Sequence, residues 1–367
     1  MSDSWSVENA EKIREEVWRL RFREEGRAQY EAWRHSRTWA EPVDFGSFDV
    51  EGQLPVEDTS WRIEKLLPAN GNALVIGPRK VGKSTFVGQA IKAITGGGML
   101  LGHFRAQPAT VAWLNYENSC ETQRQWVRDL NLAHPERLHL LHLRGVSMPL
   151  SAPLVRRWLV KWLRDRGVGV LILDPYLRAA QGVVSDEQDN GQANTFTMLI
   201  DEIKAEAGVA EAVIPTHTPK ARVEPGAESA RGAGRLEDWA DSLIYVTRDL
   251  VLKTRFIRAE GRDVDLDESA LIFEPATRGL SIDLFGGDRE QARRERVITN
   301  GRAEVLRALR EAGPEGLSQR ELSEVTGLYA AKLKPIIREM IRLGEIHVVP
   351  GPRGSRLHRL GPRPVGD

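Results

Sequence analysis

The residues from Gly77 to Thr85 have the types and the spacing of a loop that binds phosphate. They read Gly-Pro-Arg-Lys-Val-Gly-Lys-Ser-Thr and match the pattern G-x-x-x-x-G-K-[ST]. Gly77 and Gly82 allow the backbone to curl until successive N–H groups face phosphate oxygens, and a helix starting here adds partial positive charge. We expect Lys83 to reach the β- and γ-phosphates of a nucleotide, and Ser84 to ligate Mg²⁺.

The flanking sequence favours this interpretation over a glycine-rich turn without a ligand. An apolar run, Asn72 to Ile76, precedes the loop, and apolar residues at helical spacing follow it as far as Thr95. Strand, loop and helix are the setting that the motif requires. The predicted cofactors are ATP and Mg²⁺, and the predicted binding residues are Gly77, Arg79, Lys80, Val81, Gly82, Lys83, Ser84 and Thr85.

A second acidic position follows another apolar run. Val168 to Leu173 reads as a buried strand, and Asp174 comes directly after it. A carboxylate at this point in a P-loop protein holds Mg²⁺, usually through water. The alternative is a turn residue before Pro175. Since Pro175 stands where a second carboxylate would otherwise follow, the base that activates water must come from elsewhere.

Two further strand ends supply candidates for the chemistry. Glu117 ends the run Thr110 to Tyr116, at the edge where open α/β sheets hold their ligands. A carboxylate there can orient and deprotonate the attacking water; the alternative is a helix cap formed with Asn118. His217 ends the run Ala212 to Thr216 and could sense the γ-phosphate, or could be a histidine of a solvent-facing loop.

Strand and helix patterns alternate through the middle of the chain, which predicts an α/β fold with a mostly parallel sheet and helices on both faces. Lys253–Glu260 and Leu271–Glu274 read as antiparallel strands added to one edge. The expected strands are Ala73–Ile76, Thr110–Tyr116, Leu138–Leu143, Val168–Leu173, Ala212–Thr216 and Leu243–Thr247. The expected helices are Ser84–Thr95, Glu121–Leu130, Pro153–Arg166 and Gln192–Ala207.

The two ends of the chain do not follow this alternation of strands and helices. Residues 1–60 read as a helical arm and linker, either docking on a neighbouring subunit or lying solvated on its own domain. The predicted ATPase domain spans 61–285, and 286–298 reads as a polar linker. Residues 299–367 predict three helices and a β-ribbon, a winged helix-turn-helix, in which Ser318 and Glu321 form a capping box.

Composition limits the possible classes. The 367 residues carry no formal net charge, but the segment from Arg289 to Asp367 holds 16 Lys and Arg against 10 Asp and Glu, a charge of +6. If any part of the chain contacts an anionic polymer, this segment is therefore the expected one. Cys120 is the single cysteine, which excludes an intramolecular disulfide. The absence of a signal sequence and of a long apolar run predicts a cytoplasmic protein with no membrane contact.

The chain from about Trp61 to Leu280 resembles the RecA-like ATPases of the RepA type, the replicative helicases of plasmids and phages. The resemblance rests on GPRKVGKST, the Glu of NYEN, LILDPY, THTPK and ARGAGRLEDWADSL. The tail GPRGSRLHRL and the segment GRDVDLD are similar to actinobacterial members that add a winged helix. The family often has His-His where this chain has Thr216-His217.

The resemblance implies roles for the residues above. Lys83, Ser84 and Asp174 would bind nucleotide and Mg²⁺, Glu117 would be the base and His217 the sensor. Family members complete each site with an arginine from a neighbouring subunit, and Arg231 is the candidate, with Arg235 and Arg262 as competitors. A homo-oligomer, in the form of a hexameric ring, follows from this arrangement.

DNA is the expected partner. RecA-like motors hold it with loops, and residues 179–191 and 218–231 fit; the second loop carries Lys220 and Arg222. Phosphate contacts are the default role for the basic residues of a winged helix, although such a module can also bind protein. The expected contacts in this module are Lys332, Lys334, Arg338, Arg342, Arg353, Arg356 and Arg359.

The sequence thus predicts an ATP-dependent DNA motor or helicase acting in the replication of plasmid, phage or mobile-element DNA. One rival is an ATP-gated DNA-binding loader, initiator or regulator that does not unwind DNA. Another is a small-molecule P-loop kinase, for which the chain offers no acceptor-site signature.

Overall fold

The computed structural model describes residues 16–21, 23–26, 61–218 and 234–361. The chain divides into two units, residues 1–58 and 59–367. In the first unit, residues 16–21 and 23–26 are helical, and the side chains of Val17, Trp18 and Leu20 are more than half exposed. Most of the predicted arm lies outside the described residues, so its role stays a prediction.

A nine-stranded sheet lies at the centre of the second unit, with the order β13-β12-β11-β10-β3-β9-β8-β6-β7. The strands from β10 to β7 in this order are parallel to their neighbours, whereas β11, β12 and β13 are antiparallel. This confirms the predicted α/β class with a mostly parallel sheet. The strands are β3 (Asn72–Gly77), β6 (Val111–Asn115), β7 (Leu138–His142), β8 (Val170–Asp174), β9 (Glu211–His217), β10 (Ser242–Arg248), β11 (Arg255–Gly261), β12 (Asp265–Glu274) and β13 (Gly279–Ile282).

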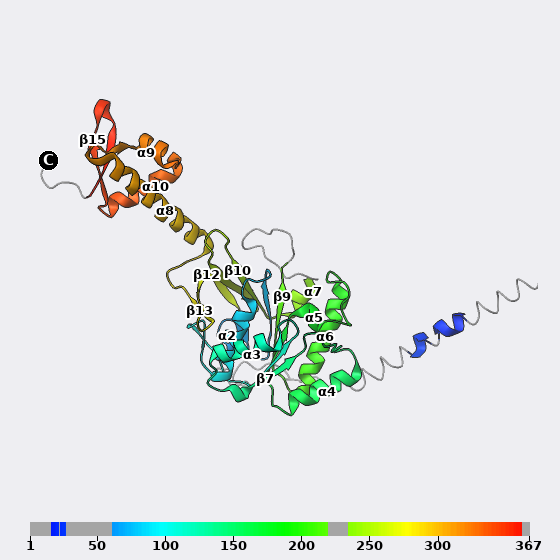
Figure 1. The fold of residues 1–367 in the computed structure, drawn as a ribbon. Helices are drawn as coiled ribbons and strands as arrows, with labels where there is room; N and C mark the ends of the chain where they lie inside the picture. Colours follow the sequence, from blue (N-terminus) through cyan, green and yellow to red (C-terminus); the bar gives the residue numbers. More distant parts are fainter. Residues whose placement is uncertain (1–15, 22, 27–60, 219–233, 362–367) are drawn as a thin grey trace, which may run out of the picture. The chain divides into compact units, whose positions relative to one another are not determined.

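Helices cover both faces of this sheet (Figure 1). On one face, Phe86 and Ile91 of α2 pack with Val75 and Trp113 of the strands. On the other face, the side chains of α4 and α6 pack against the opposite sides of the same strands. Because β3, β6 and β8 are buried on both sides, their sequences are continuous apolar runs. The helices are α2 (Lys83–Gly96), α3 (Cys120–Leu130), α4 (Pro153–Arg164), α5 (Tyr176–Ala179), α6 (Asn190–Ala207) and α7 (Gly234–Trp239).

The order of the strands decides where the functional residues meet. β3 has β9 as a neighbour, β9 is followed by β8, and β8 by β6, although the four are far apart in the sequence. In register, Gly77 is opposite His217, and Asn115 is opposite Asp174. Parallel strands end at the same edge of a sheet, so the phosphate loop, His217, Asp174 and Glu117 share one edge.

Several short elements had no clear pattern in the sequence. Two small hairpins pair β1 (Trp61–Ile63) with β2 (Leu67–Pro68) and β4 (Met99–Leu100) with β5 (Phe104–Arg105). Strands this short show no alternation that could be read from the residues. β12 is longer than predicted, because Asp265 and Leu266 already pair with β11.

The last part of the chain forms its own apolar core. Val305, Leu322, Leu333, Ile336 and Met340 are buried together there. The capping box of Ser318 and Glu321 is present as predicted, and Pro335 lies inside α10. The helices of this core are α8 (Arg289–Ala312), α9 (Gln319–Thr326) and α10 (Ala330–Arg342), and its sheet has the order β14 (Leu317–Ser318), β16 (Arg356–Leu360), β15 (Ile346–Pro350). Two short 3₁₀ turns, η2 (Gly313–Glu315) and η3 (Pro352–Gly354), also belong to it, whereas a third, η1 (Pro135–Arg137), precedes β7.

The predicted linker at 286–298 differs from the structure, because α8 already begins at Arg289. The side chain of Asp288 accepts a hydrogen bond from the N–H of Gln291 and so caps the helix. The polar composition that suggested a linker belongs to a helix with few buried positions. One continuous helix therefore leads from the sheet to the C-terminal core.

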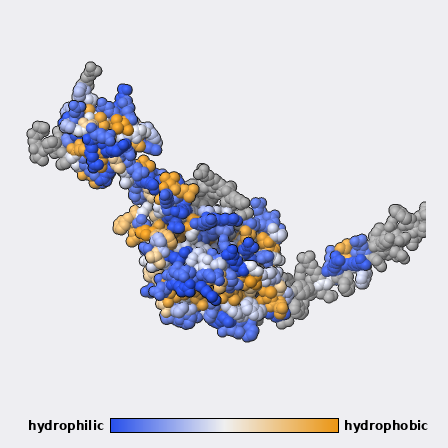
Figure 2. All heavy atoms as spheres, in the orientation of Figure 1, coloured by the Kyte–Doolittle hydropathy of each residue, from blue (hydrophilic) through white to orange (hydrophobic). Residues whose placement is uncertain are grey.

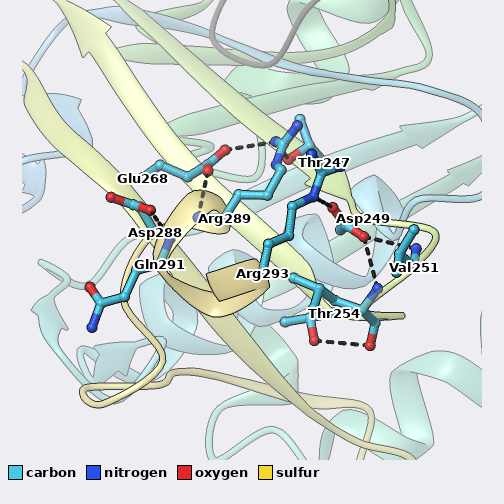
Figure 3. A network of polar contacts seen from close by, with 10 residues as sticks. Thr247, Asp249, Val251, Thr254, Glu268, Asp288, Arg289, Gln291 and Arg293 are labelled. Carbon is cyan, nitrogen blue, oxygen red and sulfur yellow. Dashed lines mark hydrogen bonds and ion pairs between the residues drawn. The ribbon is translucent and has the colours of Figure 1, made fainter. Parts of the chain in front are cut away.

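Buried ionic contacts attach the first turns of α8 to the sheet (Figure 3). The guanidinium of Arg289 donates to Glu268 Oε1 at 2.7 Å and to Thr247 Oγ1 at 2.5 Å, and its backbone N–H donates to Glu268 Oε2 at 3.0 Å. Arg289 is 8% exposed. The charge pair thus joins α8 to both β10 and β12.

A second contact lies one turn further along α8. Arg293 Nε donates to Asp249 Oδ2 at 2.6 Å, and the other carboxylate oxygen of Asp249 accepts the N–H groups of Val251 and Leu252 (Figure 3). Burial by itself would raise the pKa of Asp249, but these backbone donors and Arg293 hold it below its usual range. The carboxylate therefore stays charged at neutral pH.

Arg289→Met should lower the free energy of unfolding by about 2 kcal/mol, because it leaves the Glu268 carboxylate partly buried without its cation. Urea unfolding of the full chain measures this. Arg294→Met is the matched control, since Arg294 pairs with Glu290 on the exposed side of the same helix; it should leave stability nearly unchanged. Equal decreases in stability in the two variants would contradict a specific anchor at Arg289.

Candidate nucleotide site

The loop between β3 and α2 has a conformation that depends on its glycines. A Cβ atom on Gly77 would lie 2.2 Å from the carbonyl oxygen of Val246 in β10, so no side chain fits there. Gly82 has φ of 115° and stands as the N-cap of α2, in the left-handed region that disfavours other residues. The backbone thus curls as the sequence motif predicts.

Lys83 is buried, at 7% exposed, at the start of α2. Its Nζ atom donates to the carbonyl oxygens of Gly77 at 2.7 Å and Pro78 at 3.0 Å. Burial lowers the pKa of Lys83 to about 8, although the carboxylates of Asp174 and Glu117 oppose this shift. Because the ammonium group of Lys83 is held by hydrogen bonds to its own loop and to His217, it can exchange these carbonyl oxygens for phosphate oxygens.

His217 lies directly beside this lysine. Its Nδ1 atom is 2.8 Å from Lys83 Nζ, and since the ammonium only donates, Nδ1 accepts and the ring proton belongs on Nε2. Burial and then the positive charge of Lys83 lower the pKa of His217, so the imidazole is neutral at pH 7. The structure thus places His217 within the site rather than on a solvent-facing loop.

Asp174 ends β8 and is 2% exposed. Burial, and next the negative charge of Glu117, raise the pKa of its carboxyl to about 7, while the side chains of Trp113, Lys83 and Ser84 oppose the shift. Its Oδ2 atom has no hydrogen-bond partner in the described part of the chain. A buried carboxylate oxygen without a partner, beside a serine hydroxyl, suits a hard cation such as Mg²⁺.

Glu117 follows β6 on a turn that Asn115 organises. Asn115 is fully buried, and its Oδ1 atom accepts the N–H groups of Glu117 and Asn118, each at 3.1 Å. Glu117 is exposed, and its charge acts on Lys83, Asp174 and His217 alike. Asn115 was not among the predicted site residues, although a polar residue closing an apolar strand was a signal for it.

The alternative role of Glu117 and Asn118 as a helix cap is wrong. The N-cap of α3 is Ser119, whose hydroxyl accepts the N–H of Thr122 at 3.1 Å. Glu117 is therefore not engaged at the helix terminus.

Two arginines that were not among the predicted site residues contact the phosphate loop from the region of the antiparallel strands. Arg255 in β11 donates from Nε to the carbonyl oxygen of Val81 at 2.8 Å. Arg278, just before β13, donates to Thr85 Oγ1 at 3.3 Å and stacks on Trp126. Arg79 and Lys80 have exposed side chains on the same loop. β11 and the residue before β13 thus support the phosphate loop, a role that no sequence motif predicts.

Among the predicted trans-acting arginines, the structure describes only the competitors. Arg231 lies outside the described residues, as do Lys220 and Arg222. Arg262 pairs with Asp241 at 2.9 Å, at the edge of the sheet opposite to Lys83. Arg235 is exposed near Asp238.

The basic residues of the C-terminal core differ in solvent exposure and in ion pairing. Lys332, Lys334 and Arg338 on α10 and Arg356 on β16 are exposed, whereas Arg359 is partly buried. Arg342 forms two hydrogen bonds with the carboxylate of Glu339, at 2.9 and 2.6 Å, so it is less available than predicted. The side chain of Arg353 is not described.

No described helix has the length and apolar character to cross a membrane. Hydrophilic residues cover much of the visible face in Figure 2, with apolar residues interspersed. The described residues also hold no group of three or more His, Cys, Asp or Glu side chains that could chelate a metal ion. Mg²⁺ would therefore depend on nucleotide phosphates as well as on Ser84 and Asp174.

Comparison with known proteins places this site in a family. No curated protein matches the chain. Among solved structures, a KaiC-like protein from the hyperthermophilic archaeon Pyrococcus horikoshii OT3 is similar, with 12% identity, a TM-score of 0.43, and coverage of 59% of this chain and 90% of that one. The sequence profile of the AAA domain family, AAA_25, matches residues 40–223, which is half of the chain. With a phosphate loop, a buried Asp174 and Glu117 at one edge of a mostly parallel sheet, the chain belongs to the AAA domain family and has the fold of a P-loop ATPase.

Proposed function

We propose that this protein is an ATP-driven DNA motor of the helicase class, acting in the replication of plasmid, phage or mobile-element DNA. The observation that carries the proposal is the convergence of Lys83, Asp174, Glu117 and His217 at one edge of the sheet. Lys83 Nζ lies 2.8 Å from His217, and the charge of Glu117 reaches both Lys83 and Asp174. A lysine, two carboxylates and a histidine in this arrangement are the groups needed to bind and hydrolyse a nucleoside triphosphate.

Each side chain has one task in this reaction. Lys83 leaves the carbonyls of Gly77 and Pro78 and binds the β- and γ-phosphate oxygens. Glu117, exposed to solvent, orients a water molecule and takes its proton as the oxygen attacks the γ-phosphorus. The bond from this phosphorus to the bridging oxygen breaks, and ADP and phosphate leave. Ser84 and Asp174 would hold Mg²⁺, which would supply positive charge next to the phosphates.

His217 links the nucleotide state to the rest of the chain. When Lys83 turns to a nucleotide, Nδ1 of His217 loses its hydrogen-bond donor. His217 ends β9 and directly precedes the loop of residues 218–231, one of the two segments expected to contact DNA. Binding of ATP can therefore change the contacts of His217 at the end of β9, directly before this segment, as a motor requires.

The C-terminal core supports a DNA partner. We infer that α8, α9, α10 and the sheet of β14, β16 and β15 act as a winged helix in which α10 lies against a duplex. Lys332, Lys334 and Arg338 are exposed on α10, and the segment from Arg289 carries a charge of +6. Cations on an exposed helix neutralise DNA phosphates and make binding dependent on salt.

A second candidate function is an ATP-gated DNA-binding loader, initiator or regulator. The same C-terminal core favours it, because modules of this kind bind duplex DNA and a motor on a single strand does not need one. Strand displacement distinguishes the two candidates, since only the motor separates a duplex while it hydrolyses ATP.

Glu117→Gln should bind ATP but hydrolyse it at least ~10²-fold more slowly, because an amide cannot accept the proton of water. Lys83→Ala should lose nucleotide binding itself. Hydrolysis, nucleotide binding and displacement of a labelled strand are the measurements. Glu121→Gln, an exposed glutamate in the first turn of α3, is the matched control and should behave as wild type. Wild-type hydrolysis in Glu117→Gln would show that the base lies elsewhere; hydrolysis without displacement would favour the gated binder.

Replacing Lys334 and Arg338 together by glutamine should weaken duplex binding and flatten its salt dependence. The slope should fall by about 0.9 for each DNA phosphate that the protein no longer neutralises. The control replaces Arg307 and Arg310, which are exposed on α8. Fluorescence anisotropy with a labelled duplex at several salt concentrations measures both. The same slope in both double variants would show that α10 does not contact the duplex and would favour a protein partner.

The proposed ring predicts complementation between chains. If Arg231 acts on a neighbour's γ-phosphate, then mixing inactive Arg231→Ala with inactive Glu117→Gln should restore part of the ATP hydrolysis. Some interfaces then join an intact Glu117 to an intact Arg231; such arginines are worth ~10³-fold or more in GTPases. Mixing Arg231→Ala with a chain carrying both substitutions is the control and should stay inactive. An inactive first mixture, with hydrolysis per chain independent of protein concentration, would exclude action in trans.

A further inference from the structure

A cavity of about 220 Å³ lies beside the nucleotide site, at the carboxyl ends of β6, β7 and β8. Tyr116, directly after β6, lines one part of it, and Gly145 and Ser147, in the loop after β7, line another. Arg178 on α5 and Gln181 just beyond it complete the polar lining. No residue of the phosphate loop, 77–85, lines this cavity, so it is separate from the site for ATP.

Tyr116 lines the cavity, and its hydroxyl is buried at the cavity wall. The residue is 7% exposed, and its hydroxyl has no hydrogen-bond partner among the described residues. Burial raises the pKa of Tyr116, so the hydroxyl keeps its proton and can donate. A buried polar group without a partner is costly, and a ligand that accepts its hydrogen bond removes that cost.

The lining has positive charge and hydrogen-bond donors but no carboxylate. Arg178 is exposed and has no ion pair in the described part of the chain, so its guanidinium remains free to bind two oxygens of one group. Gln181 and Ser147 can donate from an amide and a hydroxyl. A set of donors around one arginine suits an oxyanion and excludes a cation.

The cavity is partly open to solvent, so its volume limits the size of the group that it can enclose. At ~30 Å³ for each water molecule, the cavity has room for about seven waters, more than a bare phosphate needs and less than the ~300 Å³ of a drug-sized site. We propose that the cavity binds a small oxyanion, a phosphate group that is free or carried by a small organic molecule, through Arg178, Tyr116 and their neighbours.

The site has a direct connection with the candidate chemistry. Tyr116 precedes Glu117, and its N–H donates to the carbonyl oxygen of Asp174 at 2.9 Å. An anion held by Tyr116 therefore rests next to the turn that carries the proposed base. The oxyanion site does not depend on that role or on DNA unwinding, because binding alone defines it.

The experiment is equilibrium dialysis of labelled inorganic phosphate, and separately of glycerol phosphate, against the full chain. A nonhydrolysable ATP analogue and Mg²⁺ are present at saturation, so that the phosphate loop is already filled. One additional phosphate group should bind per chain. Arg178→Gln should weaken this binding at least tenfold, and Tyr116→Phe should weaken it severalfold while preserving the apolar packing of the ring.

Two matched variants should retain wild-type binding. Arg157→Gln removes an exposed arginine of α4, and Tyr176→Phe removes another buried hydroxyl without a partner; neither residue lines the cavity. Preferential binding of inorganic phosphate would identify the free ion as the ligand, and tighter binding of glycerol phosphate would identify an ester. The proposal is overturned if neither compound binds beside the analogue, or if binding is the same in Arg178→Gln and Tyr116→Phe as in wild type.

Discussion

The close approach of β10 to the phosphate loop is the contact on which the rest of this structure depends. The carbonyl oxygen of Val246 occupies the place where a side chain of residue 77 would begin, 2.2 Å from a Cβ atom there. β10 pairs in parallel with β3 on one side and antiparallel with β11 on the other. β10 therefore connects β3, which leads into the phosphate loop, with the antiparallel strands, which support this loop.

Lys83 and Asp174 are buried before any ligand arrives, and each is held in a different way. Lys83 uses the carbonyls of its own loop, whereas Asp174 keeps one oxygen without a partner and its pKa is raised to about 7 by burial and by Glu117. Uncompensated burial of this kind disfavours the free site relative to a site that holds a cation and phosphates. The pocket is thus arranged for a ligand that brings both charges with it.

The sequence was sufficient for the parts that follow from local pattern. The strand before Gly77, the helix after Lys83 and the apolar strand ending at Asp174 lie where the residues predicted them. Long buried strands and a glycine loop leave a strong signal because packing and backbone conformation restrict each residue. The roles of Asn115, Arg255 and Arg278 could not be predicted, since each depends on a partner that only the folded sheet brings near. The start of α8 at Arg289 was missed because its helical turns carry mostly polar side chains, anchored by charge rather than by an apolar face.

The end of β10 also binds the two arginines that attach α8 to the sheet. Thr247 and Asp249 follow Val246 on the chain, and they receive the guanidinium groups of Arg289 and Arg293. A shift of the phosphate loop that displaces Val246 would thus act on the same few residues that hold the first two turns of α8. Since α8 continues unbroken to Ala312 and contributes Val305 and Leu309 to the C-terminal core, a change at its start need not pass through a flexible linker. The contacts of Arg289 and Arg293 therefore join the end of β10, which closely approaches the phosphate loop, to the helix that continues into the C-terminal core.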